Sequence, residues 1–288
     1  MIPFDKRQGH IWVDGVFKNW NESTVHILNH GLHYGSCVFE GIRIYNGKIF
    51  KLDEHIERLF KSAELLDLKI PFSLGEIKRI TIEITKKQKV TNGYIRPVVW
   101  RGSEKMAISA MDATTHIAIA AWSWPSYFSP DKILKGISLT TSNWVRPAPN
   151  MAPTNSKAAG LYMICSLSKH EAERAGFDDA LMLDYRGFIA EATGANIFFI
   201  KNKKLFTPLP DCFLDGITRQ SVIEISKSLK IDVEENHYKL DFLGECEEVF
   251  LTGTAVEITP VCKIDNFTFN VGETTRLLIK EFNKKVNS

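Results

Sequence analysis

Several side chains of this sequence could do chemistry, and Lys157 is the first of them. It lies in the segment Pro153–Tyr162, among serine, alanine and glycine residues. A lysine that condenses with a flat aldehyde cofactor needs such clearance, and it needs a lowered pKa so that the neutral amine can attack. A single lysine is usually a solvated surface charge, so Lys157 gains weight only in combination with other groups.

Glu191 is the second candidate, because it is a carboxylate within the small and apolar segment Phe188–Phe199. A buried charge is costly unless it is paired, which suggests a cationic partner such as a pyridinium nitrogen. The alternative is a buried glutamate that serves a structural hydrogen bond.

Two segments have the composition of a phosphate site. Leu214–Arg219 opens a predicted helix, and Leu251–Ala255 is a glycine turn flanked by threonine hydroxyls. Backbone N–H groups, the helix dipole and hydroxyl groups together bind a dianion without needing a net positive charge. Taken alone, each segment could equally be a plain helix cap or turn.

Tyr94 and Arg96 are separated by one residue in the predicted strand 93–100. Their side chains therefore emerge on the same face, where a guanidinium beside a phenol is a good receiver for a carboxylate. The alternative is an arginine on an edge strand that faces solvent.

The elements that must position these groups alternate between hairpins and helices. Asp-Gly and Asn-Gly turns predict hairpins over Ile11–Phe17 and Ile42–Phe50. Apolar spacing predicts a helix over 53–67, capped by Asp53, and a second helix from Ser73, which opens a capping box. Further strands are expected at 93–100, 116–124, 136–144 and 179–199, and further helices at 156–175, 218–229 and from 273 onward.

The length of 288 residues leaves room for two domains. We expect a smaller α/β domain over residues 1–130 and a larger C-terminal domain over 131–288 that carries Lys157, because a proline-bearing stretch lies at 124–130. Hairpins outnumber strand–helix–strand units, and the glycine motifs of dinucleotide and P-loop sites are missing. An α+β architecture follows.

Charge and cysteine content exclude several classes of function. Lys and Arg number 36 against 34 Asp and Glu, so there is no electrostatic footprint for nucleic acid or an anionic membrane. No apolar run predicts a signal peptide or a membrane helix, and we expect a cytoplasmic protein. The five cysteines are expected to be reduced, and His30 and His33 lack further ligands at metal-binding spacing, so no metal is expected.

The order of these motifs resembles that of a known family, the branched-chain amino acid aminotransferases among the fold-type IV pyridoxal-phosphate enzymes. The similarity runs from about Ile11 to Val261. It is carried by His33–Gly35, Phe39–Arg43, Tyr94–Pro97, Asn155–Tyr162, Glu191–Phe198, Gly216–Arg219 and Gly253–Pro260. The resemblance implies the two-domain fold of the D-amino acid aminotransferase type, with pyridoxal 5'-phosphate as the cofactor.

The resemblance also implies a role for each residue. Lys157 would hold the cofactor covalently, Glu191 would keep its pyridine nitrogen protonated, and Tyr162 would hydrogen-bond its phenolic oxygen. Its phosphate would be bound by Arg58, Ile217, Thr218 and Thr254. The substrate α-carboxylate would be received by Tyr94 and the backbone of Thr254 and Ala255. This assignment leaves Arg96, which shares the strand face of Tyr94, for the distal carboxylate of glutamate. The side-chain pocket would be walled by Phe39, Trp124, Tyr127 and Tyr162, with Tyr34 contributed by a partner subunit.

The implied reaction moves the amino group of leucine, isoleucine or valine to 2-oxoglutarate with ping-pong kinetics, in a homodimer or homohexamer whose other partners are small amino acids and 2-oxo acids. A D-amino acid aminotransferase is the nearest alternative, followed by an aminodeoxychorismate lyase. The Arg-x-His carboxylate trap typical of D-amino acid enzymes is missing between Trp100 and Ala113. A catalytically silent binding protein of the same fold is the alternative from another class. One segment departs from the family pattern: Ala107 stands where a glycine is expected, which leaves the breadth of substrates open.

Overall fold

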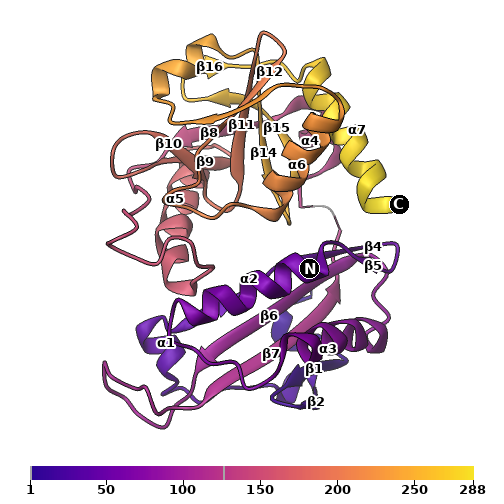
Figure 1. Cartoon of the computed structure of the whole chain (residues 1–288), viewed down its shortest axis with the longest axis vertical. Coiled ribbons are helices and arrows are strands. Elements are labelled where there is room, and N and C mark those ends of the chain that lie inside the picture. Colours follow the sequence, from indigo (N-terminus) through magenta and orange to yellow (C-terminus); the bar gives the residue numbers. More distant parts are fainter. Residues whose placement is uncertain (1, 126) are drawn as a thin grey trace. The chain divides into compact units, whose positions relative to one another are not determined.

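The computed structural model describes residues 2–125 and 127–288 (Figure 1). Contacts between residues divide the chain into two compact units, Met1–Pro125 with Ser156–Gly160, and Ser126–Asn155 with Leu161–Ser288. We expected a division near residue 130 with Lys157 in the second domain. By its contacts, the short segment that carries Lys157 groups instead with the first unit.

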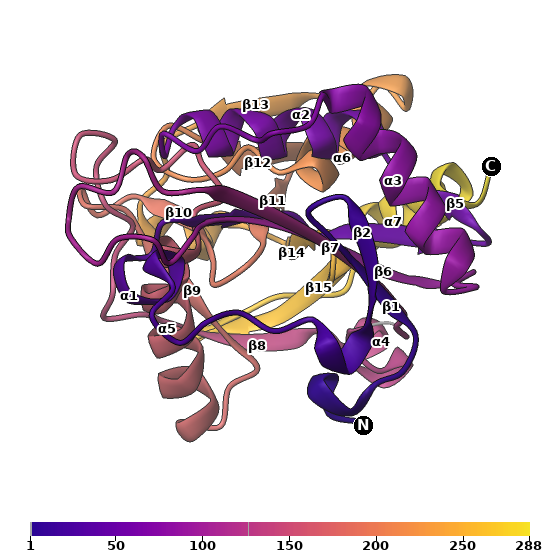
Figure 2. The same ribbon diagram turned by 90° about the horizontal axis from the view of Figure 1, so that it is seen from below.

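The first unit is an antiparallel sheet covered by two helices. Among the described residues, the strand order is β2-β1-β7-β6-β4-β5, and β3 pairs with β6 beside β4. The strands are β1 (His10–Val13), β2 (Val16–Asn19), β3 (Cys37–Phe39), β4 (Ile42–Tyr45), β5 (Lys48–Ile49), β6 (Gly93–Arg101) and β7 (Thr115–Ser123). Helices α2 (Leu52–Glu64) and α3 (Leu74–Lys87) lie on the same side of β6 and β7 (Figure 2). Their apolar faces bury one core with the sheet.

Local signals explain most of this unit. Asp14 and Gly15 adopt positive φ values of 48° and 99°, and Asn46 and Gly47 adopt 48° and 82°, which confirms both predicted hairpin turns. Ser73 and Glu76 form the expected capping box of α3. Helix α2 differs from the prediction, because it begins at Leu52 after Lys51 in the left-handed region, and Asp53 lies in its first turn. The helix ends at Glu64 instead of residue 67.

The second unit is built on a larger sheet that closes on itself. Its main path is β10-β9-β8-β15-β14-β11-β12-β13, with β16 on β15, and β10 also pairs with β11. The strands are β8 (Ile137–Thr141), β9 (Asp179–Leu183), β10 (Ile189–Ala192), β11 (Asn196–Lys201), β12 (Lys204–Pro208), β13 (Val233–Asn236), β14 (Glu248–Gly253), β15 (Glu257–Ile264) and β16 (Phe267–Thr268). The β10–β11 pairing closes six of these strands into a ring, and the pair that makes it is Glu191 with Asn196.

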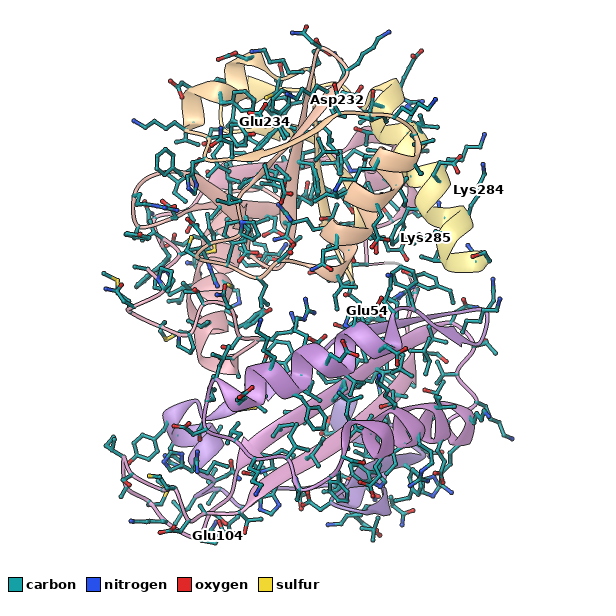
Figure 3. All side chains as sticks on the ribbon, in the orientation of Figure 1. Glu54, Glu104, Asp232, Glu234, Lys284 and Lys285 are labelled. Atoms are coloured by element: carbon teal, nitrogen blue, oxygen red, sulfur yellow. The ribbon has the colours of Figure 1, made fainter. Side chains whose placement is uncertain are left out.

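Helices surround this ring of strands. Helix α5 (Tyr162–Arg174) packs on β9, α6 (Ile217–Ser228) on β14 and α7 (Glu273–Asn287) on β14 and β15. A short helix, α4 (Pro130–Lys135), was not predicted, although Ser129 caps it and Pro130 stands at its first position. The basic end of α7 carries Lys284 and Lys285 (Figure 3). No helix of the described residues is long and apolar enough to cross a membrane.

The prediction of a helix over 156–175 was wrong in its first turns. Helix α5 begins at Tyr162, after a short 3-10 turn, and is followed by Gly176 at a φ of 83° as expected. The preceding backbone bonds elsewhere: the Phe39 N–H donates to the Lys157 carbonyl oxygen at 3.2 Å, and Ala158 forms an isolated bridge with Val38. Because these groups pair with the end of β3, Lys157 lies in an extended segment beside the first sheet.

Candidate active site

The backbone of Lys157 is fixed on both sides by the first unit. Its N–H donates to the Ser62 hydroxyl of α2 at 3.0 Å, and its carbonyl oxygen accepts from β3. The Nζ atom lies 5.1 Å from the centre of the Phe39 ring. Burial, with the Arg58 guanidinium nearby, lowers the pKa of the Lys157 ammonium below its ordinary value. The structure thus gives Lys157 what nucleophilic chemistry requires, an amine that loses its proton easily.

Three charged or titratable side chains beside Lys157 form one buried cluster. Glu40 follows β3 and has a fully buried side chain, whose oxygens lie 2.6 Å and 3.0 Å from Nε and Nη2 of Arg58. Nδ1 of His55 lies 2.7 Å from Oε2 of Glu40. Although burial disfavours the ionised carboxylate, Arg58 and His55 hold the pKa of Glu40 well below its usual range. Burial lowers the pKa of His55 in spite of this carboxylate, which favours the neutral imidazole beside the Glu40–Arg58 ion pair.

Tyr94 and Arg96 share a face of β6, as predicted. The Arg96 guanidinium lies 4.6 Å from the centre of the Phe39 ring and 5.4 Å from that of Tyr94. Its Nη2 atom lies 3.5 Å from the Tyr94 hydroxyl, and its Nε atom is buried without a hydrogen-bond partner. The Tyr94 ring packs edge-on against Trp124 with 4.6 Å between ring centres. These side chains make an aromatic wall around a fixed guanidinium.

Gly41 makes room for this wall. A Cβ atom at position 41 would lie 1.8 Å from the Tyr94 hydroxyl oxygen, which no real side chain tolerates. The Tyr94 ring is buried and held by Trp122 and Trp124, so it cannot turn aside freely. Glycine is therefore required here for the Tyr94 hydroxyl to lie beside position 41.

In the second unit, Glu191 is paired with two groups that sequence analysis did not identify. The Arg146 Nε atom lies 3.4 Å from one of its oxygens, and the Asn196 amide donates to the other at 3.3 Å. Although burial favours the neutral form, the Glu191 carboxylate raises the pKa of Arg146 above its ordinary value. The expected cationic partner of Glu191 is thus in part a protein group, the Arg146 guanidinium.

The two predicted phosphate segments lie next to this carboxylate. Gly216 precedes α6, and no side chain caps that end of the helix. The Asn196 amide also donates to the Leu214 carbonyl oxygen at 2.9 Å. A Cβ atom at position 216 would lie 2.2 Å from the Oδ1 atom of Asn196, so only glycine fits here. Thr252, opposite Asn196 on β14, has a buried hydroxyl without a hydrogen-bond partner. An anion at the N-terminus of α6 would meet backbone N–H groups that no side chain caps.

The remaining predicted residues are placed on several elements. Ile217 and Thr218 are buried in the first turn of α6, and Thr254 and Ala255 form the turn between β14 and β15. Tyr162 begins α5, and its electrostatic interaction with Arg146 helps to raise the pKa of that guanidinium. Tyr34 ends the short helix α1 (His30–Tyr34) and is 45% exposed, and Tyr127 is 46% exposed.

Comparison with known proteins decides the family. The family model described as "Amino-transferase class IV" matches residues 37–264. The chain belongs to the class IV aminotransferases. A "Probable branched-chain-amino-acid aminotransferase" of Rickettsia bellii is 45% identical over 281 residues, which cover 96% of each protein.

Solved structures agree with this assignment. The branched-chain amino acid aminotransferase of Escherichia coli superimposes with a TM-score of 0.93 at 35% identity, over 96% of this chain and 94% of that one. A T.th. branched-chain amino acid aminotransferase complexed with N-(5'-phosphopyridoxyl)-L-glutamate gives a TM-score of 0.93 at 36% identity, over 98% and 95%. The predicted fold type is confirmed, and this class IV aminotransferase is an enzyme.

Other sequence expectations have structural outcomes in this aminotransferase. His30 is buried and bonds to the Ser36 hydroxyl at 2.6 Å and to the Ala107 carbonyl oxygen at 3.0 Å, so it supports the unusual 100–108 loop. All five cysteines are free thiols, as expected. Among the described residues, Asp184, Asp211 and Cys212 are close enough to share a metal ion, but the Arg186 guanidinium already pairs with both carboxylates.

Proposed function

We propose that this aminotransferase uses pyridoxal 5'-phosphate to move the amino group of leucine, isoleucine or valine to 2-oxoglutarate, giving branched 2-oxo acids and glutamate. The observation that carries the proposal is Lys157, whose pKa is lowered by burial and by Arg58, and whose backbone is held by Ser62 and Phe39. The names of the relatives support the substrate class, and the glutamate conjugate in the T.th. structure supports glutamate as the product.

The residues fit this cofactor on chemical grounds. Lys157 offers an amine whose pKa is lowered, and Glu191 offers a carboxyl group that could accept from a ring nitrogen. The uncapped N-terminus of α6 and the unpartnered hydroxyl of Thr252 offer donors for a dianion. The cofactor, once bound, would supply an electron sink for the negative charge that develops at the substrate Cα.

The protein groups would then divide the remaining work. The Lys157 amine would take the proton from the substrate Cα and deliver it to the cofactor's carbonyl carbon. Glu191 would hold the proton on the ring nitrogen, and Tyr162 would donate to the phenolic oxygen. Because one site must serve the amino donor and then 2-oxoglutarate, ping-pong kinetics are expected.

Recognition would be shared among groups that tolerate both substrates. Tyr94 and the backbone of Thr254 and Ala255 would bind the α-carboxylate, and Arg58, Ile217 and Thr218 would bind the phosphate with the Thr254 hydroxyl. Arg96 would meet the γ-carboxylate of glutamate. The apolar side chain would be walled by Phe39, Trp124, Tyr127 and Tyr162, with Tyr34 from a second copy in a homodimer or homohexamer.

A panel of amino donors with 2-oxoglutarate as acceptor tests this proposal. We expect L-leucine, L-isoleucine and L-valine to be turned over and D-alanine and D-glutamate to be inert. Turnover of D-amino acids alone would establish the D-specific alternative and overturn the proposal. Release of pyruvate from aminodeoxychorismate without amino transfer would likewise overturn it in favour of the lyase.

A further inference from the structure

Three polar side chains lie on the buried side of α2, next to the segment that carries Lys157. His55, Arg58 and Ser62 are three and four residues apart, which is the spacing of a single helix face. His55 and Ser62 are fully buried, and the Arg58 side chain is 15% exposed. Ser62 accepts from the Lys157 backbone, and the other two hold Glu40. One helix face therefore positions Lys157 and Arg58 together.

Glu40 accepts more hydrogen bonds than an ordinary ion pair requires. Arg58 donates through Nε and Nη2 in a bidentate geometry, His55 contacts Oε2 at 2.7 Å, and the Gly41 N–H donates to Oε2 at 3.1 Å. The Glu40 backbone is held as well, because its N–H donates to the Pro97 carbonyl oxygen at 2.9 Å. With both oxygens engaged, the guanidinium plane of Arg58 has one orientation.

We propose that Glu40 is a positioning residue that fixes the Arg58 guanidinium and balances its charge, so that Lys157 lies beside a neutral pair and not beside a lone cation. The bidentate contact uses two of the five N–H donors of an arginine and directs the other three away from Glu40. If Arg58 binds the cofactor phosphate, Glu40 also determines which N–H donors of the guanidinium face the phosphate. This part of the inference rests on the proposed function.

The opposite charges of Arg58 and Glu40 act in opposite directions on the pKa of Lys157. The charged and titratable groups that act on its amine include Arg58 on α2, Glu40 after β3, and Tyr94 and Arg96 on β6, and Lys157 in turn acts on His55 of α2. Arg58 lowers the pKa of Lys157, whereas Glu40 raises it. Loss of the Glu40 charge alone leaves Arg58 unopposed, and loss of both charges restores the balance. A residue that only filled space would not give this pattern.

The test is the titration of Lys157 in the cofactor-free full chain. Competitive labelling with acetic anhydride over a range of pH, followed by mass spectrometry of the peptide that carries Lys157, gives the midpoint. Glu40→Gln should lower this midpoint by about one pH unit, because a neighbouring opposite charge typically shifts a pKa by ~1–3 units. The double variant Glu40→Gln/Arg58→Met should return to the wild-type midpoint.

Glu54→Gln is the matched control. Glu54 precedes His55 on α2 (Figure 3), but it pairs with Lys51 at 2.7 Å and its side chain is 40% exposed. Its loss should leave the midpoint unchanged. An unchanged midpoint in Glu40→Gln, or a double variant that stays as low as the single one, would overturn the proposal.

A variant that does not fold would not leave the question open. If Glu40→Gln cannot be purified folded, Arg58→Met decides instead, because Glu40 then remains as the lone charge. Its midpoint should rise above the wild-type value, and an unchanged or lower midpoint would overturn the proposal. Labelling needs neither cofactor nor turnover, so a failure here is distinct from a failure of the proposed function, which the donor panel detects.

Discussion

Arg96 gives the sharpest prediction about substrate recognition. One pocket must accept leucine, which ends in methyl groups, and glutamate, which ends in a carboxylate. The guanidinium is already held between the rings of Phe39 and Tyr94, at 4.6 Å and 5.4 Å from their centres, and its Nε atom is buried without a partner. The proposal is that the guanidinium receives the carboxylate of glutamate, whereas the side chain of leucine packs beside the same aromatic rings.

Arg96→Leu removes this contact while keeping an apolar surface. Truncation of one member of a buried charged pair costs about 2–5 kcal/mol. Arg96 is only partly buried, so we expect a cost at the lower end of this range. Because 1.36 kcal/mol corresponds to a factor of ten, about 2 kcal/mol corresponds to a roughly thirty-fold change in rate. We expect kcat/KM for glutamate and 2-oxoglutarate to fall by about thirty-fold or more, and the leucine half-reaction to change much less.

Single-turnover absorbance measures the two half-reactions separately. Arg79→Leu is the control, because Arg79 is exposed on α3 and contacts only Glu83 at 3.4 Å among the ion pairs of the described residues. Equal losses in both half-reactions would mean that Arg96 is structural or binds the α-carboxylate, and the reasoning would be refuted.

Two further predictions concern the shape of the site and its assembly. Gly41→Ala should raise KM for every substrate at least ten-fold in steady-state assays, because the new Cβ atom would lie 1.8 Å from the Tyr94 hydroxyl. The control Gly75→Ala in α3, where nothing lies within 4 Å of the new atom, should behave as wild type. KM values of Gly41→Ala equal to those of the wild type would contradict the role of Tyr94. Leu32→Glu on α1, where Leu32 is 63% exposed close to Tyr34, should give a monomer by light scattering that has lost activity, and an active monomer would rule out a shared Tyr34.

Local features of the fold could be predicted because their causes are local. Asp-Gly and Asn-Gly turns and the Ser73 capping box depend on a few neighbouring residues, and all formed as expected. The segment at Lys157 could not be assigned from its own residues. Its backbone bonds to Phe39 and Ser62, which are about a hundred positions away, and these bonds compete with the helix that its composition favours.

The same limit applies to the site. Lys157, Glu191 and the Tyr94–Arg96 pair could be identified from their own segments, since a charge in a small or apolar stretch needs an explanation. Arg146, Asn196 and His55 were missed because their importance lies in the partner they meet. Glu40 had a readable signal, as a lone carboxylate among the apolar residues of strands β3 and β4. Like Glu191, a carboxylate in such a segment needs a partner if it is buried.

The central claim is that Lys157 carries the cofactor, and borohydride reduction tests it most directly. The purified protein should be yellow, and reduction followed by peptide mass spectrometry should place the phosphopyridoxyl group on the peptide that contains Lys157. Lys157→Arg should lose this label while a Lys169→Arg control keeps it. A phosphopyridoxyl group on any other lysine, or a colourless protein that takes up no label with added pyridoxal phosphate, would contradict the account.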